Sequence, residues 1–472
     1  MTQYMPMSMI SEFLPDAQLM NISASSQVIK RFNSDSRQVI AGDLFIALRG
    51  EKFDAHDFLN DVQAKGAMGC LVSSIEKLPQ DFPAILVKDT QEALQTLSSK
   101  WKQYCSQRKL RQVVIVTGSN GKTTVKGMIQ SIFEIAVGVD KAIATQGNFN
   151  NEIGLPLTLL RLDLNHELAV IELGMNHPGE TAVLANIVKP TIALINNAQR
   201  EHQEFMETVD AVAKEHALAI ESLSENGVAV YPADSEYSAY WKKIANQRTV
   251  IDFAFNQAAT VWGEWLNQAS GRMAIHTPQG DIKVMLKIMG DHNACNAVAA
   301  SAVAIAAGIS PAMIQAGLES FLPVNGRMQK HSLNNDITVI DDSYNANPDS
   351  VRAAIDVLSN IKTAAWLVLG DMGEVGNQGP EFHREVGHYA GEKGIQKLFA
   401  LGNLSKEAVL AYQASATQGN VAQHFADVAE LCTELNKSLQ ARKNHEEVTL
   451  LVKGSRFMRM ERVVKALAEE MH

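Results

Sequence analysis

The stretch Val113-Val-Ile-Val-Thr-Gly-Ser-Asn-Gly-Lys-Thr-Thr124 decides the fold of this chain of 472 residues. Its apolar, β-branched run predicts a strand ending at Thr117, followed by a glycine turn and a helix that starts at Lys122. In such a loop, backbone N–H groups surround phosphates, a lysine reaches the terminal ones and a hydroxyl holds Mg²⁺. The general pattern G-x-x-x-x-G-K-[ST] has glycine where this chain has Val116. We predict a nucleotide site; the simpler interpretation is a strand–helix turn with an exposed lysine.

Composition and charge narrow the class of protein. Hydrophobic residues make up 46% and charged residues 20%, which is ordinary for a globular protein. The net charge of −10, without a basic block, argues against a nucleic-acid partner. Four widely spaced cysteines predict free thiols in a reducing compartment: Cys70, Cys105, Cys295 and Cys432. Because we find no signal peptide and no apolar run of bilayer length, we predict a cytoplasmic protein that does not insert into a membrane.

The order of strand-like and helix-like segments predicts three α/β domains. Short strands precede residue 88, a helical connector covers about 90–110, and Phe321–Gly326 is the predicted hinge into the last domain. The continuous apolar runs Leu168–Leu173 and Thr191–Ile195 are typical of a parallel sheet that is buried on both faces. The predicted domains span residues 1–88, 89–318 and 319–472. Ligands bind beyond the carboxyl ends of such strands, so we expect the chemistry there.

Two residues at predicted strand ends are candidate metal ligands. Glu172 ends a buried strand beside the phosphate loop, where nucleotide-dependent enzymes keep a carboxylate for Mg²⁺. His202 follows the strand Thr191–Ile195 and is expected at the same sheet edge as a metal or substrate ligand. The alternatives are a helix-capping carboxylate and a surface histidine.

Four polar loops are further candidates for ligand binding. They are Thr145–Pro156, Gly290–Asn296, Asp341–Pro348 and Lys453–Arg456. The asparagines Asn293 and Asn296 share a helix face and either contact a base or cap the helix. Lys453 and Arg456 form either an anion clamp or an ordinary charged strand end.

Taken together, these motifs resemble the Mur ligase family over essentially the whole chain. The segments that look like its UDP-binding, ATP-binding, metal and adenine-side motifs are Ser34–Arg37, Gly42–Glu51, Phe53–His56, Thr117–Thr124, Glu172–Asn176 and Gly290–Asn293. Asp342–Pro348 and Leu369–Glu374 look most specific for the last ligase step. The resemblance implies an α/β fold of three domains. A central P-loop domain with a parallel sheet would lie between an N-terminal UDP-binding domain and a C-terminal Rossmann-like domain.

The resemblance also implies roles for individual residues. Catalysis would rest on Lys122, Glu172 and His202, and metal binding on Thr123, Glu172 and His202. The implied ATP-binding residues are Gly118, Ser119, Asn120, Gly121, Lys122, Thr123, Thr124, Asn293, Asn296, Arg327, Asp342 and Asn345. The implied UDP-substrate residues are Ser34, Asp35, Ser36, Arg37, Leu48, Arg49, Gly50, Phe53, His56, Thr145, Asn148, Asn150 and Asn151. A substrate clamp in the third domain would comprise Asn347, Lys453, Ser455 and Arg456.

The implied activity is ATP-dependent amide formation by a monomer with Mg²⁺. The implied substrates are UDP-N-acetylmuramoyl-tripeptide and D-alanyl-D-alanine. A carboxylate does not react with an amine at neutral pH until it is activated, and transfer of the γ-phosphoryl group of ATP gives a reactive acyl phosphate. Lys122 and Mg²⁺ would stabilise charge on the phosphoryl group in transit.

Other functions remain open at this stage. A nucleotide-dependent switch protein would share the phosphate loop, although the chain has no N-K-x-D segment for reading guanine. A related ligase, such as a folylpolyglutamate synthase, would share the loop and the chemistry but would not explain the first domain. The third residue of the tripeptide, diaminopimelate or lysine, is not predicted.

One departure from the family pattern leads to a separate hypothesis. Many Mur ligases carry a carbamylated lysine in the helix after the metal histidine, and alignment with that helix puts His216 at the lysine's position. Lys214 lies two residues earlier, roughly 200° around the helix. We predict that no functional carbamate forms and that His216 contacts the metal site directly or through a neighbour; otherwise, Lys214 is the modified residue.

Overall fold

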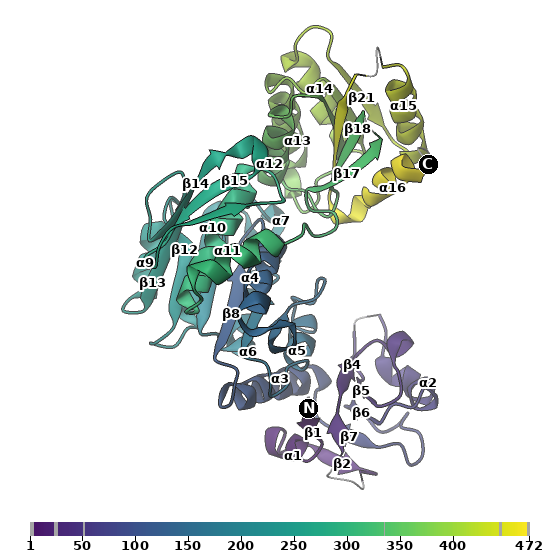
Figure 1. Ribbon diagram of the computed structural model, residues 1–472. Helices are drawn as coiled ribbons and strands as arrows, with labels where there is room; N and C mark the ends of the chain where they lie inside the picture. Colours follow the sequence, from purple (N-terminus) through teal and green to yellow (C-terminus); the bar gives the residue numbers. More distant parts are fainter. Residues whose placement is uncertain (1–3, 23–26, 51, 335, 443–445, 470–472) are drawn as a thin grey trace.

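The computed structural model describes the chain except residues 1–3, 23–26, 51, 335, 443–445 and 470–472. The structure consists of three α/β domains, each built around its own sheet, as the sequence predicts. The domains follow one another along an elongated molecule, with the first and third at opposite ends (Figure 1). Glu51, the last residue of one predicted motif, lies outside the described residues. None of the described helices is both long and apolar enough to cross a bilayer.

The first sheet has five strands, four of them parallel. Its strands, in spatial order, are β2 (Gln18–Met20), β7 (Ala84–Leu86), β6 (Gly69–Val72), β5 (Asp43–Ile46) and β4 (Arg31–Asn33). The short elements around it include β1 (Met5–Pro6), α1 (Met9–Phe13), β3 (Val28–Ile29) and α2 (Leu59–Ala64). Strands β4 and β5 run parallel, so the polar segments that follow them emerge at one sheet edge.

The central sheet has nine strands, and its parallel part carries the phosphate loop. The order is β16 (Ile282–Met285), β15 (Arg272–His276), β14 (Val261–Asn267), β13 (Thr249–Phe255), β12 (Val228–Pro232), β11 (Ile192–Ile195), β8 (Gln112–Thr117), β10 (Leu168–Glu172) and β9 (Ala142–Ala144). Strand β8 lies between β11 and β10. The next strands along the chain, β9 and β10, lie on one side of β8, whereas β11 and β12 lie on the other. The loops after these three strands therefore meet at a topological switch point, where such sheets bind ligands.

Helices cover both faces of the parallel part of this sheet. One face carries α4 (Lys122–Val137), α10 (Asp291–Ala306) and α11 (Pro311–Ser320). The other carries α3 (Thr90–Ser106), α5 (Gly154–Leu159), α6 (Glu180–Val188), α8 (Val209–Glu221) and α9 (Ser238–Ala245). This double cover explains why the inner residues of β8, β10 and β11 are apolar, since neither face meets water.

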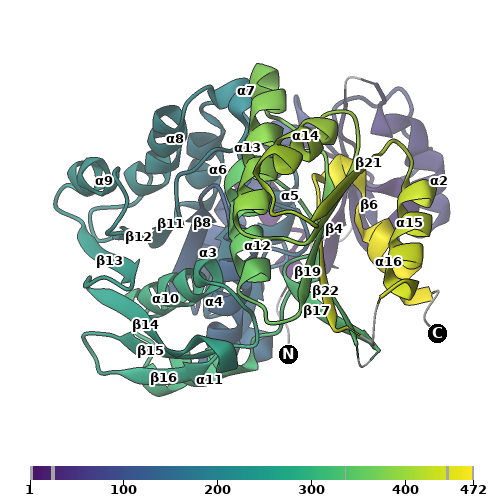
Figure 2. The same cartoon turned by 90° about the horizontal axis from the view of Figure 1, so that it is seen from above.

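The third sheet has six strands, of which only β17 is antiparallel. The order is β17 (Gln329–Asn334), β18 (Ile337–Asp342), β22 (Val448–Lys453), β19 (Ala364–Gly370), β20 (Lys397–Leu401) and β21 (Val421–Phe425). Figure 2 shows one group of helices on each side of it. The two groups are α12 (Pro348–Ser359), α13 (Gly379–Glu392) and α14 (Ser405–Ser415), and α15 (Val428–Gln440) and α16 (Glu461–Glu469).

Most predicted elements lie within a few residues of their expected positions. The connector helix α3 begins at Thr90 because the Asp89 side chain accepts hydrogen bonds from two backbone N–H groups of its first turn. Strands β13–β16 were not predicted from the sequence, because their mixed polar and apolar residues lack the continuous apolar run of the inner strands. The hinge Phe321–Gly326 lies between α11 and β17, outside helix and strand. The domain boundaries at 88/89 and 318/319 remain predictions.

Candidate active site

The phosphate loop needs glycine at two positions. Gly118 and Gly121 have φ values of +135° and +77°, which residues with a side chain rarely adopt. A Cβ atom at Gly121 would also lie 2.5 Å from the Asn296 side-chain oxygen. The loop is therefore packed against the start of α10 and turns directly into α4.

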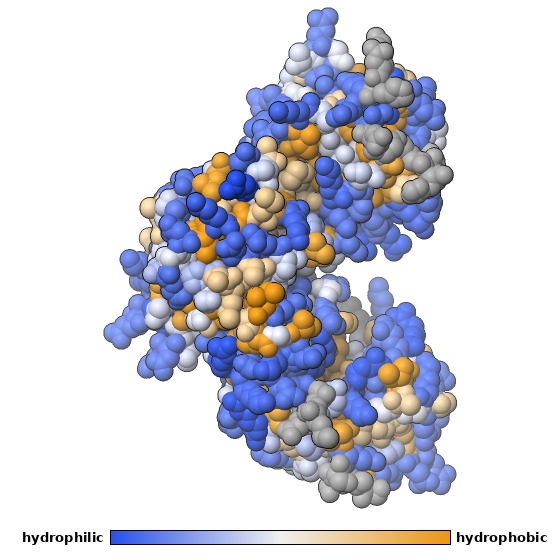
Figure 3. All heavy atoms as spheres, in the orientation of Figure 1, coloured by the Kyte–Doolittle hydropathy of each residue, from blue (hydrophilic) through white to orange (hydrophobic). Residues whose placement is uncertain are grey.

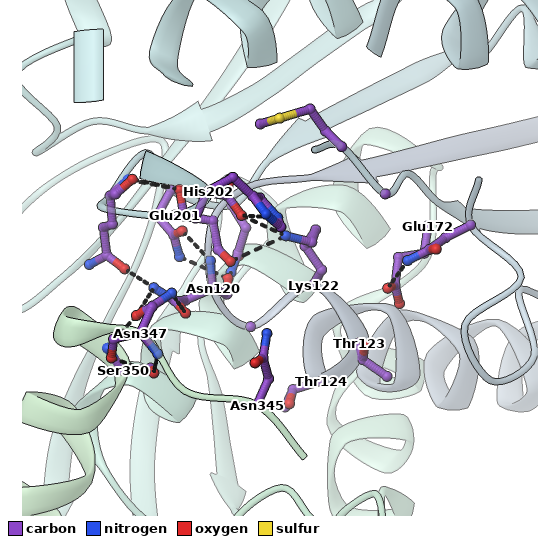
Figure 4. Close-up of a pocket in the computed structure, with 18 of the residues that line it drawn as sticks. Asn120, Lys122, Thr123, Thr124, Glu172, Glu201, His202, Asn345, Asn347 and Ser350 are labelled. Carbon is purple, nitrogen blue, oxygen red and sulfur yellow. Dashed lines mark hydrogen bonds and ion pairs between the residues drawn. The ribbon is translucent and has the colours of Figure 1, made fainter. Parts of the chain in front are cut away.

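Lys122 connects the phosphate loop to a buried carboxylate. Its ammonium group donates to the carbonyl oxygens of Gly118 and Ser119 and lies 3.2 Å from Glu201 Oε2. Figure 4 shows Lys122 between two acidic regions, with Glu201 and His202 on one side and Glu172 on the other. The first residue of α4 thus brings a positive charge to the centre of the site.

Glu201 is a site residue that was not predicted from the sequence. Its other carboxylate oxygen lies 3.0 Å from Nε2 of His216. Burial acts to raise the pKa of Glu201, but the charge of Lys122 and the contact with His216 outweigh it and lower the pKa to about 2. Glu201 is therefore a carboxylate at neutral pH. The only sequence signal was its position next to His202, which carries no periodicity that would distinguish it from a surface acid.

His216 lies beneath the site, whereas Lys214 points away from it. The His216 ring is buried and bridges two groups, because its Nδ1 lies 2.9 Å from the Thr117 hydroxyl at the end of β8. Lys214 has 60% of its side chain exposed and pairs with Asp210 at 2.7 Å. The absence of a functional carbamate stays a prediction, but the two residues point as the alignment expected.

Glu172 has a free buried oxygen that suits a cation. Its Oε1 accepts a hydrogen bond from Asn150 at 3.0 Å, and its backbone N–H donates to the Thr145 hydroxyl. Among the described residues, Oε2 has no hydrogen-bond partner although it is buried. Carboxylate and hydroxyl oxygens are the ligands that Mg²⁺ prefers, and Thr123 lies in the first turn of α4 at the same cleft. These residues fit the predicted Mg²⁺.

His202 contacts a residue of the third domain, Glu374. It precedes the short helix α7 (Gln203–Met206), and its Nδ1 lies 2.7 Å from Glu374 Oε2. This contact lowers the pKa of Glu374. Nε2 of His202 is 3.9 Å from Glu201. In the described part of the chain, no three histidine, cysteine, aspartate or glutamate side chains form a ready metal cluster.

The predicted adenine-side residues form a connected network. Asn296 accepts a hydrogen bond from Asn196 at 2.9 Å and donates one to Asn293 at 3.2 Å. The Asn293 amide also donates to the Met289 carbonyl oxygen, so both asparagines help to order the start of α10. Gly290 is the N-cap of α10, without a side-chain cap hydrogen bond, and both asparagines line the cleft. Contact with a base remains a prediction.

Residues of the third domain face the phosphate loop. Asn347 donates a hydrogen bond to the side chain of Asn120 at 2.9 Å, across more than two hundred residues of sequence. Asn345 and Asp342 also line the cleft, and the Arg327 guanidinium lies over the Tyr344 ring at 4.2 Å. The loop Asp342–Asn347 is thus held directly opposite the start of α4.

The predicted clamp residues differ in environment. Lys453 is buried, donates to Asp342 at 2.6 Å and supports the Asn345 carbonyl oxygen. Ser455 is also buried and donates to the Ala346 carbonyl oxygen. Arg456 is 60% exposed and pairs with Glu461. Lys453 and Ser455 therefore hold the loop in place, and Arg456 is the exposed cation of the set.

These loops surround one large cleft of about 1480 Å³ between the central and third domains. Figure 3 shows a hollow in the molecule where the third domain faces the first domain. The predicted site residues that line it are Ser119, Asn120, Gly121, Lys122, Thr123, Thr124, Asn148, Asn150, Asn151, Glu172, His202, Asn293, Asn296, Arg327, Asp342, Asn345, Asn347, Lys453 and Arg456. Gly118, Thr145 and Ser455 lie directly behind this lining, each bonded or joined to a residue of it.

The predicted UDP residues of the first domain form a separate group. They lie in the turns after β4 and β5: Ser34, Asp35, Ser36, Arg37, Leu48, Arg49, Gly50, Phe53 and His56. Arg37 and Arg49 pair with Asp35 and Asp54 at 2.8 and 3.1 Å. The Phe53 ring is 61% exposed, which is unusual for a phenylalanine and leaves an aromatic face open to a ligand.

Comparisons with known proteins identify the family. Residues 116–304 match the model of the Mur ligase middle domain, and residues 326–456 match the model of the Mur ligase, glutamate ligase domain. A curated relative from Escherichia coli (strain K12), named UDP-N-acetylmuramoyl-tripeptide–D-alanyl-D-alanine ligase, is 38% identical over 92% of this chain and 93% of its own. The chain belongs to the Mur ligase family. The resemblance drawn from the sequence is confirmed.

Further relatives agree with this Mur ligase assignment. The Bacillus subtilis (strain 168) ligase of the same name is 32% identical over 96% of both chains. The crystal structure of MurF from Acinetobacter baumannii matches with a TM-score of 0.88 and 31% identity, and it covers 99% of each chain. The three-domain fold and the ATP-dependent ligase class are therefore confirmed. The roles of the individual site residues remain predictions.

Proposed function

We propose that this Mur ligase joins D-alanyl-D-alanine to UDP-N-acetylmuramoyl-tripeptide and converts ATP to ADP and phosphate. The substrates are those in the names of the E. coli and B. subtilis relatives, which align with nearly the whole chain. A folylpolyglutamate-type reaction is not favoured, because relatives at this level of identity carry the muramoyl-tripeptide name. Since ATP and UDP-linked sugars are cytoplasmic metabolites, we propose a cytoplasmic site of action.

One observation carries the proposal: the phosphate loop and a polar loop of another domain meet across a single cleft. The Asn120–Asn347 hydrogen bond joins them at 2.9 Å. Amide formation through an acyl phosphate needs the γ-phosphate, the carboxylate and the amine held in line. A cleft with a phosphate loop on one wall and amide and cationic side chains on the other is suited to this alignment.

The chemistry follows from the residues that face the cleft. The substrate carboxylate attacks the γ-phosphorus of ATP, ADP leaves, and an acyl phosphate forms. The amine of D-alanyl-D-alanine then attacks the acyl carbon, and inorganic phosphate leaves. Lys122 stabilises the negative charge that moves with the phosphoryl group. Thr123 and Glu172, with His202 nearby, would hold Mg²⁺, which would supply further charge neutralisation.

The remaining predicted residues bind and orient the substrates. Arg49, Phe53 and the turn Ser34–Arg37 are proposed to hold the uridine diphosphate, with Thr145–Asn151 contacting the sugar–peptide portion as it enters the central cleft. Arg456 is proposed to bind a carboxylate of the substrates, because a guanidinium offers a planar pair of donors. We propose that a monomer is sufficient, since one chain contributes every group named here.

Phosphate release tests this proposal. The purified protein is given ATP and Mg²⁺ with a panel of UDP-muramoyl peptides, with and without D-alanyl-D-alanine. Steady phosphate release is expected only when a tripeptide and the dipeptide are both present. The same panel, with diaminopimelate or lysine as the third residue, identifies the preferred tripeptide. Release with a glutamate acceptor and no dipeptide would refute the assignment.

A further inference from the structure

Three consecutive residues after β11 point in three different directions. Glu201 lies inward against Lys122 and His216, and His202 contacts Glu374 of the third domain. Arg200, before them, reaches outward to helices α12 and α13. The first two belong to the site already described, whereas Arg200 has no assigned role.

Arg200 forms a dense set of contacts across the domain boundary. Its backbone N–H donates to Asp349 Oδ2 at 2.9 Å, and its guanidinium donates to Oδ1 of the same carboxylate at 2.5 Å. Two further guanidinium hydrogen bonds reach Glu385 at 2.6 and 3.0 Å. The guanidinium also lies 5.3 Å from the centre of the Phe382 ring. One side chain of the central domain thus joins two helices of the third.

These contacts are unlike an ordinary surface ion pair. Exposed pairs contribute little, because two flexible side chains must be ordered in water. Here all three side chains are largely covered, with exposed fractions of 23% for Arg200, 23% for Asp349 and 29% for Glu385. The planar guanidinium contacts two carboxylates at once, and the backbone N–H of Arg200 also bonds to Asp349, so the main chain is held at the same place. The arrangement therefore specifies an orientation between domains as well as an attraction.

The position of Asp349 links this contact to the reaction. Asp349 is the second residue of α12, and Asn347 caps the same helix while it contacts Asn120 of the phosphate loop. A displacement of α12 would therefore move Asn347 and Asn345 away from the phosphate loop. Because reacting groups must be aligned to within about 1 Å, a small rotation of the third domain is enough to slow ligation.

We infer that Arg200 is a positioning residue that docks the third domain onto the phosphate-loop end of the central sheet. It contacts no reacting atom in this assignment. Its function is to hold the loop Asp342–Asn347 at the correct distance from Lys122. The consequence for ligation rests on the proposed function, whereas the docking itself does not.

The test measures the distance between the two domains directly. Spin labels are attached to cysteines introduced at the exposed positions Lys243 on α9 and Lys406 on α14, with Cys295→Ser to remove the one native cysteine that is not buried. Double electron–electron resonance then gives the distribution of distances between the two spin labels in the full chain. We expect one narrow distribution for the reference protein and a broadened or shifted one for Arg200→Ala.

A matched control separates docking from general damage to the third domain. Arg352 pairs with the same Glu385 at 3.1 Å but lies on α12, within the third domain. Arg352→Ala should leave the distribution unchanged. Arg200→Lys, which keeps the charge but loses the forked contact, should give an intermediate width. An equal change in Arg352→Ala and Arg200→Ala would overturn the inference.

Kinetics provide a second readout. Arg200→Ala should lower kcat about tenfold or more at saturating substrates, while binding of the UDP substrate changes less than about twofold, because misalignment affects the bound complex. An unchanged distance distribution would overturn the inference whatever the activity. If the reference protein does not ligate, the proposed function fails, but the distance measurement still tests the docking.

Discussion

The two regions predicted to bind nucleotides are built differently. At the boundary between the central and third domains, side chains pair across domains: Arg200 with Asp349 and Glu385, and Asn120 with Asn347. In the first domain, the predicted UDP residues pair with close neighbours in sequence, such as Arg37 with Asp35 and Arg49 with Asp54. The predicted ATP site therefore depends on how two domains meet, whereas the predicted uridine-diphosphate site can form within one domain. Mutations should separate the two.

The largest effect is expected for Lys122→Ala. Loss of the charge that stabilises the transferring phosphoryl group should lower kcat by on the order of 10²–10³ or more, about 3 kcal/mol. The UDP substrate should still bind within about twofold of its normal affinity, since the residues predicted to hold its uridine diphosphate lie in another domain. Isothermal titration and phosphate release measure the two quantities. Lys141→Ala, an exposed lysine of the central domain, is the control. If Lys122→Ala weakened UDP-substrate binding as much as ligation, the two sites would not be separate.

Glu201→Gln should have the next largest effect. The variant keeps the shape of the side chain but removes the charge that holds Lys122, so ligation should fall about 10- to 100-fold. Weaker binding of a non-hydrolysable ATP analogue should accompany the loss. Full activity would show that Lys122 does not need this partner.

Glu201→Gln should also change how the stability of the fold depends on pH in the acid range. The pKa of Glu201 is about 2 in the folded protein against an ordinary value of 4.5, so the folded state binds fewer protons than the unfolded state between these values. Its contribution to stability is complete above pH 4.5 and is lost as the pH falls towards 2. Thermal unfolding between about pH 5 and pH 3.5 should therefore show a smaller decrease for Glu201→Gln than for the wild type. If both proteins lost stability equally as the pH falls, the low pKa of Glu201 in the folded protein would be contradicted.

Phe53→Ala tests the first-domain side of the comparison. Loss of an open aromatic face should weaken UDP-substrate binding about tenfold, in line with the value of stacking on a base. Binding of the ATP analogue should not change. Lys77→Ala, a half-exposed residue that pairs with Asp57, is the control in the same domain. Weakened ATP binding in Phe53→Ala would show that the two sites are coupled after all.

The smallest effect is expected for Lys214→Ala. Because the Lys214 side chain is largely exposed and pairs with Asp210, activity should stay within about twofold and should not depend on bicarbonate. His216→Asn should lower activity more, since that ring bridges Thr117 and Glu201. A loss of activity in Lys214→Ala that small acids restore would show that Lys214 is the modified residue.

The sequence by itself determined the local chemistry of this protein. An apolar run that stops at Thr117, two glycines and Lys-Thr at a helix start lead to one loop conformation, because few other residues tolerate its backbone angles. The three α/β domains and the family followed from similar motifs. Such motifs can be recognised in the sequence because each depends on residues that are only a few positions apart.

Tertiary structure alone decided which distant groups meet. Glu201 looks like any loop acid until the fold buries it between Lys122 and His216, and Arg200 gains its partners only when the third domain docks. His202 was expected at the same sheet edge as Glu172, and only the structure shows its contact with Glu374 of the third domain. These contacts join residues separated by many positions, and no periodicity in the chain encodes them. Burial and charge pairing between domains are properties of the folded arrangement, so only the structure could reveal them.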